Sequence, residues 1–199
     1  YADPYTKEEL ESFHKQSEDA KKPYLYRDYR PENPPKWDGT QALRLKVTDI
    51  KQSFWHDEVR GDLSAGVEAL DDIILIKSDG YPTYNFAHII DDLEMGVTHI
   101  MRADEFISST PKFLSIYEAL EIKHPIFVTL PPIMGDDGKK KLGKRDGAKD
   151  VMEYKSEGYL PEAMVNFLAF IGCNPGDERE IVTPEELVQI FDISKIHHS

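Results

Sequence analysis

The chain has 199 residues, and its 24 lysines and arginines stand against 37 aspartates and glutamates, giving a formal net charge of −13 that argues against a DNA-coating protein. Hydrophobic residues make up 40% of the sequence, which is enough for a folded core and too much for a disordered acidic chain. The longest apolar runs, including 73–76 and 126–130, fall far short of the roughly 20 residues that cross a bilayer, so we expect no membrane insertion.

Two further features bear on where the chain works and on its completeness. The single cysteine, Cys173, cannot form an internal disulfide and leaves no Cys-x-x-Cys motif for zinc, so we expect a reducing cytoplasm. Tyr1 is no initiator residue, and the residues after it read like the interior of a longer sequence. We therefore expect the chain to be a piece of a larger protein.

The first part of the chain predicts one helix and two strands. A Thr-x-x-Glu capping box that begins at Thr6 opens a polar helix reaching about Asp19. Prolines and tyrosines between 22 and 38 predict a connecting loop. Alternating residues over 42–47 indicate a strand with one solvent-exposed face, and the apolar run 73–76 indicates a strand buried on both faces.

The middle of the chain alternates strands with helices. Apolar residues at helical spacing cover 84–90, and a β-branched run covers 97–101. Thr110 and Pro111 begin a helix with proline in its first turn, and the run 126–130 predicts another strand. This alternation favours an α/β fold with parallel strands joined by helices.

The pattern after Gly147 is entirely helical. One helix covers 160–171 and begins at Pro161, and a second capping box, at Thr183, opens another. We therefore expect a mixed α/β part followed by a helical part.

A basic segment, 139–149, stands out in this acidic protein. It carries six basic residues and one acidic residue, and its glycines allow the backbone to come close to a bulky anion. Lysines are mobile point charges that suit a polyphosphate. Taken alone, such a run is more often a solvated surface loop.

Tyr84 and His88 are four residues apart and share one face of their predicted helix. The tyrosine hydroxyl and the imidazole could bind a small polar ligand, although packing in the core explains the same two residues equally well. Asp91 and Asp92 offer oxygen atoms to Mg²⁺. Adjacent acids more often flank a helix or strand, and we assign no metal site to the chain.

Arg102 directly follows the predicted strand 97–101. Ligands bind at the carboxyl ends of strands in a parallel α/β sheet, and an arginine there can hold a carboxylate with two hydrogen bonds. A structural ion pair with Asp104 or Glu105 is the competing interpretation.

Several ordered motifs together resemble the catalytic domain of the bacterial-type glutamyl-tRNA synthetases, which belong to class I. The resemblance extends from about Tyr1 to the last residue. The segments that carry it are 78–87, 91–92, 95–102, 109–111, 141–145 and 158–163.

The resemblance implies the second half of a Rossmann-type catalytic domain, with part of its inserted segment before it and an α-helical region after it. Residues 1–70 would belong to the inserted acceptor-binding segment, 71–150 to the catalytic half, and 151–199 to the start of the helical stem-contact region. The implied enzyme is a cytoplasmic, monomeric ligase that uses ATP with Mg²⁺, glutamate and tRNA, and binds neither DNA nor a membrane. It would join glutamate to ATP and pass the glutamyl group to the 3′ end of tRNA.

The resemblance also implies roles for single residues. The segment Lys141, Leu142, Gly143, Lys144 and Arg145 matches the family's ATP-binding Lys-Met-Ser-Lys-Ser loop. Its catalytic lysines, Lys141 and Lys144, would neutralise charge on the departing pyrophosphate.

The glutamate pocket implied by the resemblance would contain Tyr84, His88 and Arg102, with Arg102 holding a carboxylate of the substrate. Within this implied pocket, His88 occupies a position at which the residue varies among members of the family.

The sequence departs from the family pattern at several points. Gly143 stands where serine is usual, so a hydroxyl contact is lost. No His-x-Gly-His motif occurs, so the first half of the ATP site is missing from the 199 residues, and without further cysteines we expect no zinc. A glutaminyl relative, a tRNA-modifying glutamyl relative and a non-catalytic tRNA-binding module remain as alternatives.

Overall fold

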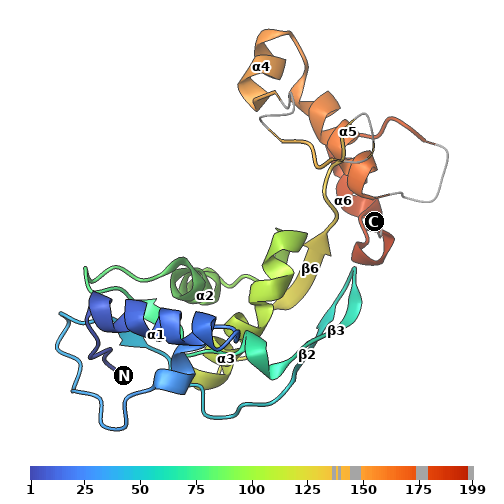
Figure 1. Cartoon of the computed structure of the whole chain (residues 1–199). Coiled ribbons are helices and arrows are strands. Elements are labelled where there is room, and N and C mark those ends of the chain that lie inside the picture. The colour runs from blue at the N-terminus through green and yellow to red at the C-terminus, as the bar shows by residue number, and fades with distance from the viewer. Residues whose placement is uncertain (136–137, 139, 144–148, 174–178, 197–199) are drawn as a thin grey trace. The chain divides into compact units, whose positions relative to one another are not determined.

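The computed structural model describes residues 1–135, 138, 140–143, 149–173 and 179–196. The chain divides into two compact units. Figure 1 colours the ribbon by residue number, so the segments of each unit can be found in it. The first unit comprises Tyr1–Trp55, Asp62–His99 and Glu105–Pro125, and the second comprises His56–Gly61, Ile100–Asp104 and Ile126–Ser199. The division into 1–70, 71–150 and 151–199 stays a prediction from the sequence.

The first unit contains most of the predicted α/β elements. Its helices and strands are α1 (Lys7–Asp19), β1 (Leu43–Arg44), β4 (Ile74–Ile76), α2 (Tyr84–Glu94) and α3 (Thr110–Ala119). Short 3-10 helices cover Tyr26–Tyr29, Val67–Ala69 and Asp104–Ser109. The boundary between the units falls within β2 (Ser53–Asp57), β3 (Gly61–Ala65) and β5 (His99–Ala103).

The second unit contains β6 and a helical region. Its elements are β6 (Ile126–Leu130), α4 (Val151–Ser156), α5 (Pro161–Gly172), α6 (Pro184–Ile190) and the 3-10 helix Ile193–Lys195. The helices predicted at 160–171 and after Thr183 are confirmed, whereas the prediction missed α4. Its Asp150 accepts a hydrogen bond from the backbone of Met152 (2.9 Å) and forms a capping box with Glu153.

Strand pairing confirms the expected mixture of sheet and helix. Strands β3, β2, β6 and β5 form a sheet in that order, and β2 runs parallel to β6 with Asp57 opposite Phe127. Strands β1 and β4 form a separate antiparallel ladder that pairs Leu43 with Ile76. The sequence analysis did not predict β2 and β3.

The predicted strands 42–47 and 73–76 differ from the observed ones. Only Leu43–Arg44 forms a strand in the first, and Arg44 is buried although the alternation placed it on the wet face. Residues 73–76 are half-buried rather than buried on both faces. The reason is that β4 pairs with β1 in a ladder of two strands and contacts α2, so no second layer covers it completely.

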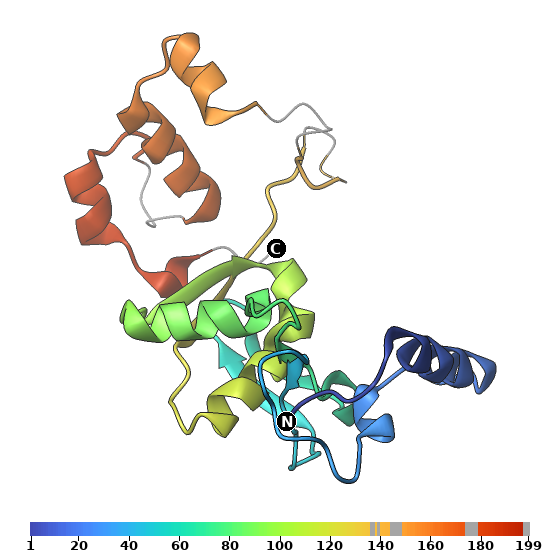
Figure 2. The same ribbon diagram turned by 90° about the vertical axis from the view of Figure 1, so that its left-hand side faces the viewer.

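The core of the first unit lies where α2 contacts α3, a contact that can be followed in Figures 1 and 2. Ile89 of α2 and Phe113 and Ile116 of α3 are at most 2% exposed. The second unit has a small cluster of Val59, Val128 and Ile196. Burial of each such side chain stabilises the folded chain by roughly 1.5–3 kcal/mol.

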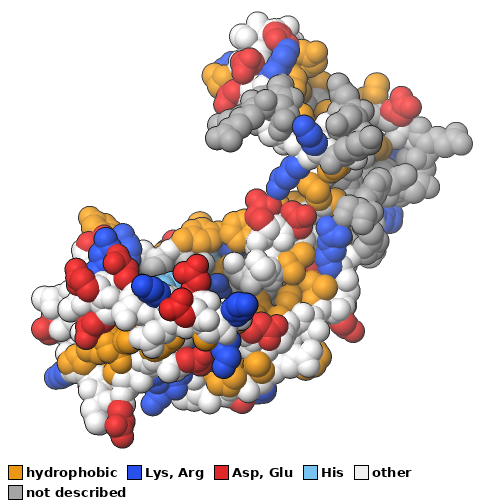
Figure 3. Space-filling model, in the orientation of Figure 1, with side chains coloured by type: hydrophobic (Ala, Val, Ile, Leu, Met, Phe, Trp, Pro, Cys, Tyr) orange, Lys and Arg blue, Asp and Glu red, His pale blue; other side chains and the backbone are white. Residues whose placement is uncertain are grey.

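The helices α4, α5 and α6 contain no buried residue among those described. Apolar side chains such as Leu160, Phe167 and Val188 are more than 60% exposed, and Figure 3 shows apolar atoms over the surface of this helical region. Tertiary packing within the described residues therefore adds little to these helices. Local caps begin α4 and α6, including the predicted capping box in which Thr183 and Glu186 hydrogen bond to each other's backbone, whereas α5 begins at Pro161 without a side-chain cap.

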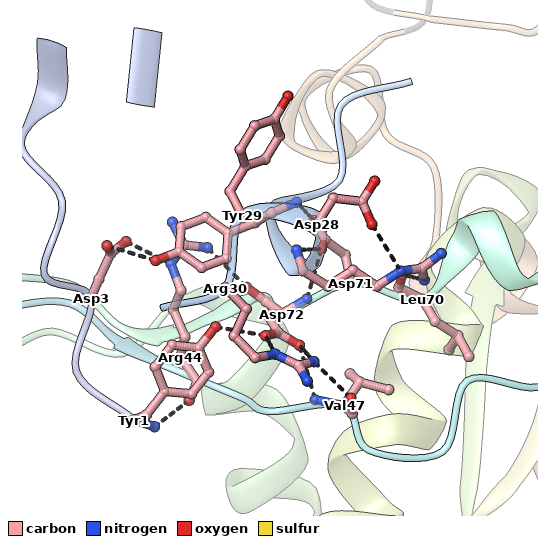
Figure 4. A network of polar contacts seen from close by, with 12 residues as sticks. Tyr1, Asp3, Asp28, Tyr29, Arg30, Arg44, Val47, Leu70, Asp71 and Asp72 are labelled. Carbon is pink, nitrogen blue, oxygen red and sulfur yellow. Dashed lines mark hydrogen bonds and ion pairs between the residues drawn. The ribbon is translucent and has the colours of Figure 1, made fainter. Parts of the chain in front are cut away.

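A buried network of polar side chains holds the first unit together (Figure 4). At its centre is Asp72, whose carboxylate is fully buried. It accepts hydrogen bonds from Arg30 Nε (2.5 Å) and Nη2 (2.7 Å), from the Tyr1 hydroxyl (2.6 Å) and from the backbone of Val47 (3.0 Å). Burial alone would raise the pKa of the Asp72 carboxyl, but these donors outweigh it and hold the pKa below its usual value.

A second carboxylate extends this network. Asp3 accepts from Arg44 Nε (2.6 Å) and from the Tyr26 hydroxyl (2.8 Å), and the Arg44 guanidinium lies 3.5 Å from the centre of the Tyr26 ring. Burial and the hydrogen bond to Asp3 raise the pKa of Tyr26. The segment predicted as a loop, 22–38, thus contains a 3-10 helix that these contacts fix to the strand ladder.

We expect Asp72→Asn to lower the free energy of unfolding of the 199-residue chain by about 2–4 kcal/mol at pH 7, because Arg30 loses its charged partner. The folded-state pKa of Asp72 is lowered, so its contribution is complete above the unfolded pKa of about 4 and is lost as the pH falls through the folded pKa. Urea unfolding should therefore show that the free energies of unfolding of wild type and variant differ by a constant amount from pH 6 to 8. This difference should become smaller below about pH 5.

The control for this prediction is Asp49→Asn, which removes an exposed aspartate paired with Lys51 and should leave the free energy of unfolding nearly unchanged. Equal effects of the two substitutions would contradict a stabilising role for the buried network.

Candidate active site

The turn before α2 fixes the start of the helix that carries two of the predicted site residues. Gly80 has a φ of +84°, and its N–H donates to the carbonyl of Lys77 (2.9 Å). Thr83 donates from its backbone N–H to Leu75 (2.8 Å) and from its hydroxyl to the carbonyl of Ile74 (2.8 Å). Because its hydroxyl is used in this way, Thr83 precedes α2 without capping it, and the helix start is bound to β4.

Tyr84 and His88 lie next to each other on α2, as their spacing predicts, with ring centres 5.1 Å apart. His88 is 8% exposed: its ring meets the edge of Phe113 (4.6 Å), and Nδ1 is 3.4 Å from Asp92 Oδ2. Tyr84 is 55% exposed and lies 6.0 Å from Phe106. Tyr84 therefore presents accessible surface to a ligand, whereas His88 supports the same face from within the first unit.

Arg102 is the fourth residue of β5, so it lies within the strand rather than directly after it. It is half-buried and belongs to the second unit, whereas Tyr84 and His88 belong to the first. The pocket of three residues implied by the resemblance stays a proposal.

The described part of the basic segment begins as a ladder that continues from β6. Leu142 donates to the carbonyl of Ile133 (2.7 Å), Met134 pairs with Lys141, and Gly135 donates to the carbonyl of Lys140 (2.8 Å). The structure thus places Lys141, Leu142 and Gly143 beyond the carboxyl end of β6. Lys144 and Arg145 lie outside the described residues.

Lys141 is an exposed cation near the end of β5. Its Nζ is 4.0 Å from Asp104 Oδ1, and both side chains are about half exposed. An ion pair so open to water contributes little to stability.

One functional candidate that the sequence analysis missed is Asp57 at the end of β2. It is 1% exposed and lies on the same buried face of the strand as Trp55. The signal in the sequence is an acidic residue at a core-facing position, two residues after a tryptophan and four before Gly61. The hydrogen bonds of Asp57 connect β2 with β6.

Neither a metal cluster nor a membrane span is found in the described ranges. Residues 1–135, 138, 140–143, 149–173 and 179–196 contain no group of three His, Cys, Asp or Glu side chains placed to hold a metal ion. Of the two adjacent acidic residues considered for Mg²⁺, Asp91 and Asp92, the second contacts His88. None of the helices in these ranges has the length and apolar character needed to cross a bilayer.

Comparison with known proteins places these elements in one family. The model of the class I tRNA synthetases (E and Q), catalytic domain, matches residues 1–199. A glutamate–tRNA ligase of Clostridium kluyveri is 39% identical over 201 residues, covering 98% of this chain and 41% of the relative. A glutamate–tRNA ligase of Clostridium botulinum is 45% identical over 156 residues, covering 78% of this chain and 32% of the relative.

Solved structures agree. A crystal structure of a glutamate tRNA ligase from Elizabethkingia meningosepticum in complex with its amino acid matches with a TM-score of 0.81 and 32% identity, covering 98% of this chain and 45% of that one. A glutamate-tRNA synthetase from Elizabethkingia anophelis matches with a TM-score of 0.79, covering 97% of this chain and 45% of that one. The chain spans less than half the length of these relatives. Both the predicted fold class and the resemblance are confirmed, and the chain belongs to the class I tRNA synthetases for glutamate and glutamine, matching their catalytic domain.

Proposed function

We propose that the chain is part of a glutamate–tRNA ligase that activates glutamate with ATP and transfers the glutamyl group to the 3′ end of tRNA. The supporting observation is its similarity to glutamate–tRNA ligases, at 39% identity, along 98% of the chain. The Elizabethkingia meningosepticum ligase, similar in fold, was crystallised with its amino acid. The relatives compared above are all glutamate rather than glutamine ligases, which favours glutamate as the substrate.

The proposed reaction has two steps. An oxygen of the glutamate α-carboxylate attacks the α-phosphorus of ATP, and the bond to pyrophosphate breaks. A hydroxyl of the terminal ribose of tRNA then attacks the carbonyl carbon of the adenylate, and AMP leaves. Negative charge grows on the leaving phosphates, so fixed cations beside them stabilise the transition states.

We assign the cationic role to Lys141 and Lys144, and the wider ATP-binding role to the whole segment from Lys141 to Arg145, including Leu142 and Gly143. The ladder from Ile133 to Leu142 supports this, because it carries Lys141 away from the sheet into water, where a phosphate chain can reach it. Mg²⁺ would arrive with ATP as part of the substrate, and we propose no zinc site.

The glutamate-binding role falls to Tyr84, His88 and Arg102. The guanidinium of Arg102 matches a carboxylate with two parallel hydrogen bonds. The Tyr84 hydroxyl can donate to the substrate, and His88, packed against Tyr84 and Phe113, keeps the tyrosine ring in place. We further propose that the ligase is a cytoplasmic monomer, with residues 1–70, 71–150 and 151–199 divided as the sequence predicts.

The test of this function is charging of tRNA by the full-length protein. We expect transfer of radiolabelled glutamate to tRNA in the presence of ATP, and at least a hundredfold less transfer of glutamine. The 199-residue chain alone should show no glutamate-dependent exchange of pyrophosphate into ATP, even with tRNA added, because it lacks a His-x-Gly-His motif. A full-length protein that binds tRNA without charging it would instead support a binding module.

For Arg102, we expect Arg102→Ala in the full-length enzyme to lower kcat/KM for glutamate about 30-fold or more. Loss of one partner of a buried charged pair costs about 2–5 kcal/mol. KM for ATP should change much less. Steady-state charging kinetics measure both, with Arg179→Ala as the control because Arg179 is an exposed arginine beside Glu186. An unchanged kcat/KM for glutamate would indicate that Arg102 has a structural role.

For Lys144, we expect Lys144→Ala to lower kcat for adenylate formation by roughly 10²–10³, because only interactions stronger in the transition state raise kcat. Lys149→Ala should do little, since Lys149 is already bound to Glu157 (2.6 Å). Single-turnover measurements with saturating ATP, glutamate and tRNA distinguish the two. Small and equal effects of the two substitutions on kcat would indicate that the segment is a solvated basic surface.

A further inference from the structure

The Asp57 carboxylate is buried and fully supplied with donors. Oδ1 accepts hydrogen bonds from the backbone N–H groups of Val59 (3.0 Å), Arg60 (2.9 Å) and Thr129 (3.1 Å). Oδ2 accepts from the Thr129 hydroxyl (2.6 Å). A carboxylate with so little access to water is tolerated only when donors replace the lost hydration, and here three backbone groups and one hydroxyl do so.

These hydrogen bonds join two parts of the second unit. Val59 and Arg60 form the turn after β2, and Thr129 is the second-last residue of β6. The backbone reinforces the same junction, because Glu58 donates to the carbonyl of Phe127 (3.0 Å). Around it, Val59 packs with Val128 of β6 in the core cluster. The end of β6 is therefore bound to β2 through one buried carboxylate, which Thr129 contacts with both its backbone and its side chain.

The segment bound in this way leads directly into the basic segment. One residue after Thr129 the strand ends, and three residues later the ladder that carries Lys141 begins at Ile133. Hydrogen bonds from Leu142 to Ile133 and from Gly135 to Lys140 connect the two sides of this ladder. Only residues 131 and 132 lie between the end of β6 and this ladder.

We infer that Asp57 and Thr129 are positioning residues for Lys141: their hydrogen bonds set where the ladder that carries Lys141 leaves β6. This inference rests on the proposed function for its effect on catalysis. Both side chains are buried, at 1% and 8% exposure, so they act on Lys141 without touching a substrate.

The first test of the inference needs no catalysis. Thr129→Val keeps the shape and the backbone donor but removes the hydroxyl, whereas Thr129→Ser keeps the hydroxyl. In limited proteolysis of the 199-residue chain by trypsin, which cuts after lysine and arginine, we expect cleavage between 139 and 149 to be about five-fold faster for Thr129→Val than for wild type. Thr129→Ser should resemble wild type.

A matched control separates positioning from general loss of stability. Thr110 is a comparably buried threonine of the first unit, and its hydroxyl donates to the carbonyl of Phe106 (3.2 Å). Thr110→Val should leave cleavage between 139 and 149 unchanged. Equal acceleration by Thr110→Val and Thr129→Val, or no acceleration by Thr129→Val, would overturn the inference whether or not the protein is a ligase.

The second test uses the full-length enzyme. Thr129→Val should lower kcat for adenylate formation about ten-fold while KM for glutamate changes less than two-fold, and Thr129→Ser should restore kcat. When Lys141→Ala is already present, Thr129→Val should lower kcat by less than two-fold, because the lysine whose backbone the ladder holds is gone. If the double variant loses kcat by the product of the two separate effects, the inference is overturned. A wild-type enzyme without adenylate formation would refute the proposed function, and the proteolysis result would still decide the role of Thr129.

Discussion

A carboxylate that leaves water has to be surrounded by donors, and this requirement organises both units of the chain. In the first unit, Asp72 connects Arg30 and the backbone of Val47 through side-chain and backbone donors (Figure 4). In the second, Asp57 connects the turn after β2 with β6. Each carboxylate joins segments that are far apart in the sequence, 42 residues for Arg30 with Asp72 and 72 for Asp57 with Thr129. An apolar contact tolerates sliding, whereas these directional hydrogen bonds fix one register.

The sequence predicts best those elements whose cause is local. The helix ends at Thr6 and Thr183 follow from side chains three residues apart, and both capping boxes are observed. Burial depends on distant partners, which a local pattern does not contain. The alternation therefore predicts a wet face for Arg44, although Asp3 and the Tyr26 ring cover it, and local patterns predict neither β2 nor β3.

The candidate site divides in the same way. The spacing of Tyr84 and His88 predicted that they share a helix face, and their rings do lie together. Their unequal exposure could not be predicted, because it depends on Phe113 of α3, which covers His88 and leaves Tyr84 open. His88 is thus mostly enclosed by protein. A substitution at His88 would alter the surface on which the Tyr84 ring rests.

The electrostatics of the chain explain why the basic segment has to be held in place. It carries six basic residues and one acidic residue, and outside it acidic residues outnumber basic ones two to one. A polyphosphate or a nucleic acid is therefore repelled by most of the chain and attracted to residues 139–149, so the field that steers it converges on this segment. Steering alone brings the anion near without orienting it. The proposed reaction would require the lysines to meet the phosphates within a fraction of an ångström, and a point charge on a flexible side chain reaches that precision only when its backbone is fixed. The ladder on β6, anchored at its base by neutral donors around Asp57, fixes the backbone of Lys141, and this anchor adds no charged side chain as a donor. An anchor made of arginines would compete with Lys141 for the same phosphate, whereas backbone N–H groups and one hydroxyl leave the positive charge of the segment to the ligand.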